Sequence, residues 1–161
     1  MLKGAMKVST LAMRLFYKYD REYFLVLICA NKPTSTLLNE ISQELTIGLN
    51  AQAIAALQLD SNNEEVKPIT YEIETNISEA YLTVQCSLLP TYKMKILLTS
   101  PVFRTENFLN IDETKSEQIA QLNPDPDDML NKDKCLEAAA EIRMLFRYLN
   151  QTHTHKTCFS F

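Results

Sequence analysis

The sequence predicts an α+β (mixed α/β) fold in which a mixed sheet is flanked by helices. Three observations lead to this class: a β-prone run near the start, three further β-like pieces at short spacing, and two stretches with the apolar spacing of a helix. The chain has 161 residues, 46% of them hydrophobic, which is enough for one core and little for two domains. We expect one globular domain over residues 1–150, followed by a disordered tail at 151–161.

The first part of the chain predicts one strand and one helix. Residues 5–16 are apolar without a clear period, whereas residues 24–29 form a continuous β-prone run that is typical of a buried central strand. Apolar residues then recur at helical spacing, and Thr34 or Ser35 is available as the N-cap. These features predict a surface helix over residues 34–49.

The middle of the chain predicts a loop and three strands. Residues 58–68 are polar and acidic without a period, which favours a loop. The β-like pieces cover residues 69–75, 81–88 and 93–99, and a turn is expected at 76–79. Because their connections are short, we expect the three strands to pair antiparallel.

The last third predicts a linker and a long helix. Residues 110–128 are polar and contain Pro124 and Pro126, as an exposed linker would. Asn131 is a good N-cap, and the helix that follows it is expected to end near residue 149. The apolar side of this helix comprises Leu136, Ala139, Ala140, Ile142, Leu145, Phe146 and Leu149.

The composition argues against several classes of function. Lys plus Arg number 16 and Asp plus Glu 20, and the resulting formal charge of −4 provides no general attraction to phosphate backbones. No run approaches the ~20 apolar residues of a membrane span, so we expect a soluble intracellular protein without membrane contact. The cysteines lack CxxC spacing, which predicts reduced structural thiols; they are Cys29, Cys86, Cys135 and Cys158.

Several short phrases of the sequence follow one another in a specific order between residues 2 and 149. They are residues 2–8 and 11–12, 20–21 before 25–29, 32–33 with 37–38, 71–73, 78–80, 98–101 with Arg104, and 125–136. The last phrase reads Asp-Pro-Asp-Asp-Met-Leu-Asn-Lys-Asp-Lys-Cys-Leu. In this order they resemble the DZF domain of the zinc-finger RNA-binding proteins and of the nuclear-factor double-stranded-RNA-binding proteins. The resemblance covers nearly the whole chain but only the N-terminal half of that domain.

The resemblance implies a nucleotidyltransferase-like mixed sheet with flanking helices, from which the family's C-terminal helical lobe, with its dimer interface, is missing. Active members of the superfamily hold metal ions and a nucleoside triphosphate with a Gly-Ser turn and three carboxylates. Here Asp20 and Glu22 are the only carboxylates in the right place, and Lys93 and Lys95 stand on the strand that should supply another. We therefore predict a catalytically inactive module, not an enzyme, with no cofactor and no bound metal.

The leading interpretation of this resemblance is protein–protein association within complexes that bind double- and single-stranded RNA. The partner would be another DZF-domain protein or a different protein, and RNA would be contacted indirectly. The resemblance alone places the protein in the nucleus, with the cytoplasm as a second location. One alternative is a residual nucleotide-binding or nucleotidyltransferase enzyme, in which Lys93 or Lys95 replaces the metal beside Asp20 and Glu22. The other is a degenerate, truncated paralogue.

Two sets of residues are candidates for binding surfaces. The apolar stripe of the last helix would face the missing lobe, which leaves it to bind a partner or to pack against the sheet. This stripe comprises Ile142, Leu145, Phe146 and Leu149. Basic residues near the start are interleaved with aromatic ones, a composition that suits single-stranded nucleic acid, although a cationic surface beside core aromatics explains it as well. The basic residues are Lys3, Lys7, Arg14, Lys18 and Arg21.

The histidines form a single pair near the end of the chain. His153 and His155 lie near Cys158, and on an extended strand both rings would face one metal ion. Because no second cluster of ligands accompanies the pair, we expect solvated histidines. The chain has no other histidine, so no Ser/His/Asp or Cys/His catalytic set can be assembled.

Overall fold

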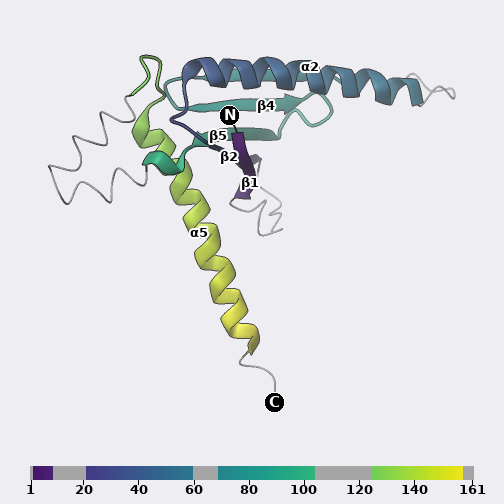
Figure 1. Cartoon of the computed structure of the whole chain (residues 1–161). Coiled ribbons are helices and arrows are strands. Elements are labelled where there is room, and N and C mark those ends of the chain that lie inside the picture. Colours follow the sequence, from purple (N-terminus) through teal and green to yellow (C-terminus); the bar gives the residue numbers. More distant parts are fainter. Residues whose placement is uncertain (1, 9–20, 60–68, 104–124, 158–161) are drawn as a thin grey trace.

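The computed structural model describes residues 2–8, 21–59, 69–103 and 125–157 (Figure 1). Within these ranges five strands form one mixed sheet, and two long helices pack against it. The predicted α+β class is confirmed. The strands are β1 (Leu2–Val8), β2 (Glu22–Cys29), β3 (Tyr71–Asn76), β4 (Tyr81–Cys86) and β5 (Lys93–Thr99), and the helices are α2 (Ser35–Leu59) and α5 (Lys132–Thr157).

The sheet has the strand order β1-β2-β5-β4-β3. β2 and β5 run parallel, with Leu25 opposite Ile96, and every other neighbouring pair in this sheet is antiparallel. The β-prone run at residues 24–29 lies in β2, an interior strand of the sheet, as predicted. The predicted antiparallel pairing of β3, β4 and β5 is also confirmed. A parallel pair needs a crossover connection, and α2 lies in that connection over one face of the sheet (Figure 1).

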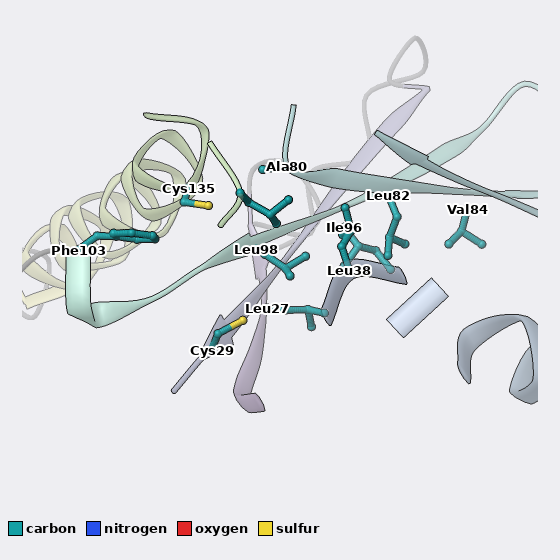
Figure 2. Packing of buried hydrophobic residues seen from close by; sticks show 11 residues of the cluster. Leu27, Cys29, Leu38, Ala80, Leu82, Val84, Ile96, Leu98, Phe103 and Cys135 are labelled. Atoms are coloured by element: carbon teal, nitrogen blue, oxygen red, sulfur yellow. The ribbon is translucent and has the colours of Figure 1, made fainter. Parts of the chain in front are cut away.

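The main core lies between the sheet and α2. Side chains alternate between the two faces of a sheet, so every second residue of the inner strands points toward this helix. Figure 2 shows Leu27, Ile96 and Leu98 pointing into this core together with side chains from β4 and α2. The buried members of the cluster are Leu27, Cys29, Leu38, Ala80, Leu82, Val84, Ile96, Leu98, Phe103, Leu130 and Cys135.

A smaller core lies on the opposite face of the sheet, under the first half of α5. Val8 of β1 and Val26 of β2 are completely buried there against Ala138 of the helix. Phe24 and Ile142 pack around this cluster. Farther along its length α5 runs away from the sheet (Figure 1).

The helix α2 is longer than its predicted span. Its N-cap is Thr34, as the sequence allows, because Thr34 Oγ1 accepts a hydrogen bond from Leu37 N at 3.1 Å. The helix ends only at Leu59, so the predicted end near residue 49 is wrong. It continues because Leu49 and Ala53 still pack inward, and a single interior glycine weakens a helix without ending it. Residues 60–68 of the predicted loop lie outside the described ranges.

Residues 125–131 are docked against the connection between β2 and α2. Ser35 N donates a hydrogen bond to the Asp128 carbonyl oxygen at 2.8 Å, and the buried ammonium of Lys32 forms an ion pair with Asp125. The prediction of an exposed linker is therefore wrong for its last residues, which pair with a segment about ninety positions earlier. The preceding part of the predicted linker lies outside the described ranges.

The Asp128 carboxylate adds a second cap to α2. Its Oδ2 atom accepts hydrogen bonds from Thr36 N at 3.1 Å and from Thr36 Oγ1 at 2.6 Å. The side-chain hydrogen bond from Thr36 is the main reason why the pKa of Asp128 lies below its ordinary value. A negative charge at a helix N-terminus also interacts favourably with the helix dipole.

The helix α5 starts where it is predicted and ends later. Asn131 is its cap, because Asn131 Oδ1 accepts a hydrogen bond from Asp133 N at 2.9 Å. The helix runs to Thr157, so the expected end near residue 149 is wrong, and residues 151–157 of the predicted tail belong to this helix. No proline or glycine interrupts this stretch, which removes the usual stop signals. Residues 158–161 of the predicted tail lie outside the described ranges.

The connection from β3 to β4 is a tight turn, as predicted. Asn76 Oδ1 accepts hydrogen bonds from Ser78 Oγ at 2.8 Å and from Glu79 N at 3.1 Å. Ala80 closes the turn with a φ of 56°, a left-handed conformation that L-residues rarely adopt. Its methyl group is buried in the main core, which compensates for the unfavourable backbone conformation.

Candidate functional site

The residues predicted for a remnant nucleotide site lie at the start of β2 and β5. Glu22 opens β2 opposite Lys93, and Phe24 lies opposite Lys95. All four therefore occupy the same face of the sheet, which is the face opposite α2. Asp20 lies outside the described residues, so its position beside Glu22 stays a prediction.

The centre of this group is the ammonium of Lys95. Its Nζ atom lies 2.9 Å from Glu22 Oε2, 5.3 Å from the ring centroid of Tyr81 and 5.9 Å from that of Phe24. The carboxylate and the faces of the two rings each attract a cation at these distances. Because the Lys95 side chain is only 24% exposed and that of Glu22 is 47% exposed, the pair is partly shielded from water.

This arrangement has a clear chemical consequence for Glu22. Phosphoryl transfer with metal ions needs carboxylates that are free to coordinate the metals. A divalent cation approaching Glu22 would meet the positive charge of Lys95 and would have to displace it. Within the described part of the chain, no group of three or more His, Cys, Asp or Glu side chains is close enough to hold a metal ion.

Lys93 is placed differently from Lys95. Its backbone N–H donates to the carbonyl oxygen of Arg21 at 2.7 Å, and its exposed side chain makes no ion pair with a described residue. It also lines a hollow at the start of β5, which Glu22 and Lys95 do not line. The structure therefore brings Glu22 and Lys95 into contact and leaves Lys93 apart from them.

The apolar residues predicted to bind a partner do not form one open stripe. Ile142 packs on the small core, so it follows the predicted alternative of packing against the sheet. Leu145 is only 8% exposed and is therefore buried within the chain. Phe146 remains 51% exposed, and Met144, which is not among the predicted residues, is 54% exposed. The side chain of Leu149 lies outside the described part.

The basic residues predicted to contact RNA are placed only in part. Lys3 and Lys7 lie on the edge strand β1 and both are exposed, but Lys3 stands at an irregularity of the strand between Leu2 and Gly4, so alternation does not place it on the same face as Lys7. Arg21 is exposed immediately before β2. Arg14 and Lys18 lie outside the described residues, so RNA contact through these five basic residues stays a prediction.

The predicted structural thiols agree with the described cysteines. Cys29 and Cys135 are buried in the main core and free, and Cys86 is half-buried and free. Burial raises the pKa of Cys135 to about 12, with a smaller contribution from Cys29, and burial also raises the pKa of Cys29. Neither buried thiol is therefore ionised near neutral pH. Cys158 lies outside the described residues, and His153 and His155 belong to α5 and not to an extended strand.

A site that the sequence analysis misses lies where β5 begins. An apolar hollow of about 430 Å³ opens there between β2, β5, β4, β3 and the loop before β5. Its lining residues are Tyr23, Tyr71, Val84, Cys86, Leu89, Tyr92, Lys93 and Met94. The signal in the sequence is weak: a loop that is unusually apolar, with Leu88, Leu89 and Tyr92 between two strands.

A comparison with protein families finds no family model that matches the chain. In the described part of the chain, neither helix is long and apolar enough to cross a membrane.

Proposed function

We propose that this chain is a catalytically inactive, nucleotidyltransferase-like module of the DZF type that acts through association with a protein partner in RNA-binding complexes. The order of the sequence phrases supports the kinship. The mixed five-stranded sheet with packed helices is the architecture that this kinship implies. The role is therefore to bind a partner, and any RNA is held mainly by that partner.

The observation that carries the inactive character is the contact between Lys95 and Glu22. In an active member the strand beside Glu22 would supply a second carboxylate to a metal ion. Here the same position of β5 supplies an ammonium, which is bound to Glu22 at 2.9 Å and lies over two aromatic rings. Replacing a carboxylate by a lysine changes the local charge by two units and removes the attraction for Mg²⁺.

The association is supported by the exposed apolar residues of α5. Phe146 and Met144 are each about half exposed, and they flank the buried Leu145 because successive residues of a helix are ~100° apart. Both lie C-terminal to Ala138 and Ile142, which pack on the small core. Exposed aromatic and methionine side chains are enriched where proteins bind one another. The helix thus offers a surface on either side of its buried stripe.

One experiment tests the catalytic half of the proposal. The whole chain is incubated with labelled ATP and Mg²⁺ or Mn²⁺, with and without an RNA primer, and both hydrolysis and nucleotide transfer are measured. We expect no turnover from the wild-type chain. Metal-dependent turnover that disappears in the Glu22→Gln variant would contradict the proposal, because Glu22 would then be available to a metal ion.

A second experiment tests the association. The chain is mixed with the DZF domain of a double-stranded-RNA-binding protein, and complex formation is followed by analytical ultracentrifugation. We expect a complex with a Kd of about 1 μM or below, weakened by Phe146→Asp or Met144→Asp. Ile47→Asp on α2 is the matched control, since Ile47 is also an exposed apolar residue of a helix and lies far from α5 in the chain. A complex that the α5 variants and the control affect equally would speak against α5 as the binding surface.

A further inference from the structure

The hollow at the start of β5 is a built feature of the sheet. Its floor is a row of three neighbouring strands, because Met94 of β5 lies opposite Tyr23 of β2 and opposite Val84 of β4. The next row adds Tyr71 and Cys86, which lie opposite each other on β3 and β4. These residues project from one face of the sheet. The residues at the floor of the hollow therefore stand on hydrogen-bonded strands and not on a single loop.

The loop from β4 to β5 forms the wall of the hollow and is held in place by hydrogen bonds. Leu89 N donates to the carbonyl oxygen of Cys86 at 3.0 Å, and Tyr92 N donates to the carbonyl oxygen of Leu89 at 3.0 Å. Gln85 Nε2 also donates to the carbonyl oxygen of Pro90. Because the loop is closed by these contacts before any ligand arrives, little ordering would be needed on binding.

The lining chemistry favours a flat aromatic molecule. The rings of Tyr23 and Tyr92 are nearly parallel, with 17° between their planes and 6.1 Å between their centroids. The two rings stack on each other and together present an aromatic surface against which a further ring can pack, and the thioether of Met94 makes favourable contacts with aromatic rings. A volume of about 430 Å³ lies toward the small end of ligand pockets, which suits a molecule of one or two rings.

The charge at the rim favours an anion. Lys93 is the one basic residue among those that line the hollow, and its exposed ammonium makes no ion pair with a described residue. No carboxylate lines the hollow, so nothing there opposes a negative ligand. A carboxylate on the ligand would meet this ammonium while the rings remain against the apolar floor.

We propose that this hollow is a binding site for planar aromatic carboxylates of one or two rings. Packing against the stacked Tyr23–Tyr92 pair holds the rings, and Lys93 selects the carboxylate. Glu22 and Lys95 do not line the hollow, and no residue of α5 does, so the site does not depend on the proposed inactive transferase character or on association through α5. Its test and theirs can fail independently.

The test is a titration of the whole chain with 2-naphthoate, followed by the amide signals of Cys86 and Met94 in two-dimensional NMR. The neutral 2-naphthalenemethanol serves as the comparison ligand. We expect saturable shifts with a Kd of roughly 1 mM or lower and tighter binding of the carboxylate. Leu89→Ala should weaken both ligands, whereas Lys93→Ala should weaken only 2-naphthoate, by about threefold or more.

Two matched controls separate the site from general stickiness. Leu88→Ala removes a neighbouring exposed leucine that does not line the hollow, and Lys7→Ala removes an exposed strand lysine on β1. Both controls should bind 2-naphthoate like the wild type. The proposal is overturned if no saturable binding occurs, if the controls weaken binding as much as Leu89→Ala does, or if Lys93→Ala retains the preference for the carboxylate.

Discussion

The contact between Glu22 and Lys95 predicts a measurable coupling energy. The two substitutions are Glu22→Gln and Lys95→Met, which remove one charge each and keep side chains of similar length. They are made singly and together in the whole chain. The free energy of unfolding of the four proteins then gives the coupling between the two side chains, free of their separate effects.

The size of this coupling follows from the geometry. An exposed ion pair is worth roughly 0.2–1 kcal/mol, because water screens the charges and two long side chains lose freedom. The distance of 2.9 Å and the 24% exposure of Lys95 place this pair toward the upper end of that range. We expect a coupling of about 0.5–1 kcal/mol that decreases in about 1 M salt. Lys95→Met alone should cost somewhat more, since it also removes cation–π contacts with Phe24 and Tyr81 worth about 0.5 kcal/mol each.

The assay is urea unfolding followed by circular dichroism at constant pH. Glu22→Gln combined with Lys7→Met is the control cycle, because Lys7 lies on β1 and makes no recorded contact with Glu22. The control cycle should give no coupling. A coupling in the Glu22–Lys95 cycle that is no larger than in the control would refute the reasoning, and would leave Glu22 free for other ligands.

Four further predictions concern stability and thiol chemistry. Gly48→Ala should stabilise the chain by about 0.5–1 kcal/mol in urea unfolding, because the added Cβ meets no atom within 4 Å and the residue lies inside α2; a destabilised variant would contradict this. Asn131→Ala should cost about 1 kcal/mol through loss of the α5 cap, whereas Asn131→Ser should restore most of it, and equal losses in both would exclude a capping role. In a Cys158→Ser background, Cys86 should react with a thiol reagent at pH 8 in the folded protein, and Cys135 only after unfolding. Because the pKa of Cys135 is about 12 in the folded chain and about 8.5 in an unfolded one, the chain should lose stability as the pH rises above about 9, and Cys135→Ala should reduce that loss; an unchanged pH profile would contradict it.

The elements that the sequence predicts correctly are those whose signal is local. The β-prone run of β2 and the caps Thr34 and Asn131 lie next to the residues they act on, so their chemistry is visible in a short window. The short connections between β3, β4 and β5 likewise determine antiparallel pairing. Where the prediction of an element is wrong, at the ends of α2 and α5, no stop signal is present and packing decides the length.

The candidate site could be predicted only as a list of residues. The sequence indicates that Glu22 and Lys95 are relevant, but it contains no information that they touch, because they are 73 positions apart and meet only through the parallel register of β2 and β5. The same register assembles the hollow from Tyr23 and Met94. Neither residue carries a motif of its own.

The sequence by itself determined the class of the fold and the order of β2, α2, β3, β4, β5 and α5, but it did not predict the edge strand β1 (Leu2–Val8). Tertiary structure alone decided that Lys95 neutralises Glu22, that Leu145 is buried within the chain while Phe146 remains exposed, and that an apolar hollow opens where β5 begins. The physical reason is that secondary structure follows from interactions between near neighbours, whereas these contacts depend on how strands distant in sequence are aligned in the sheet.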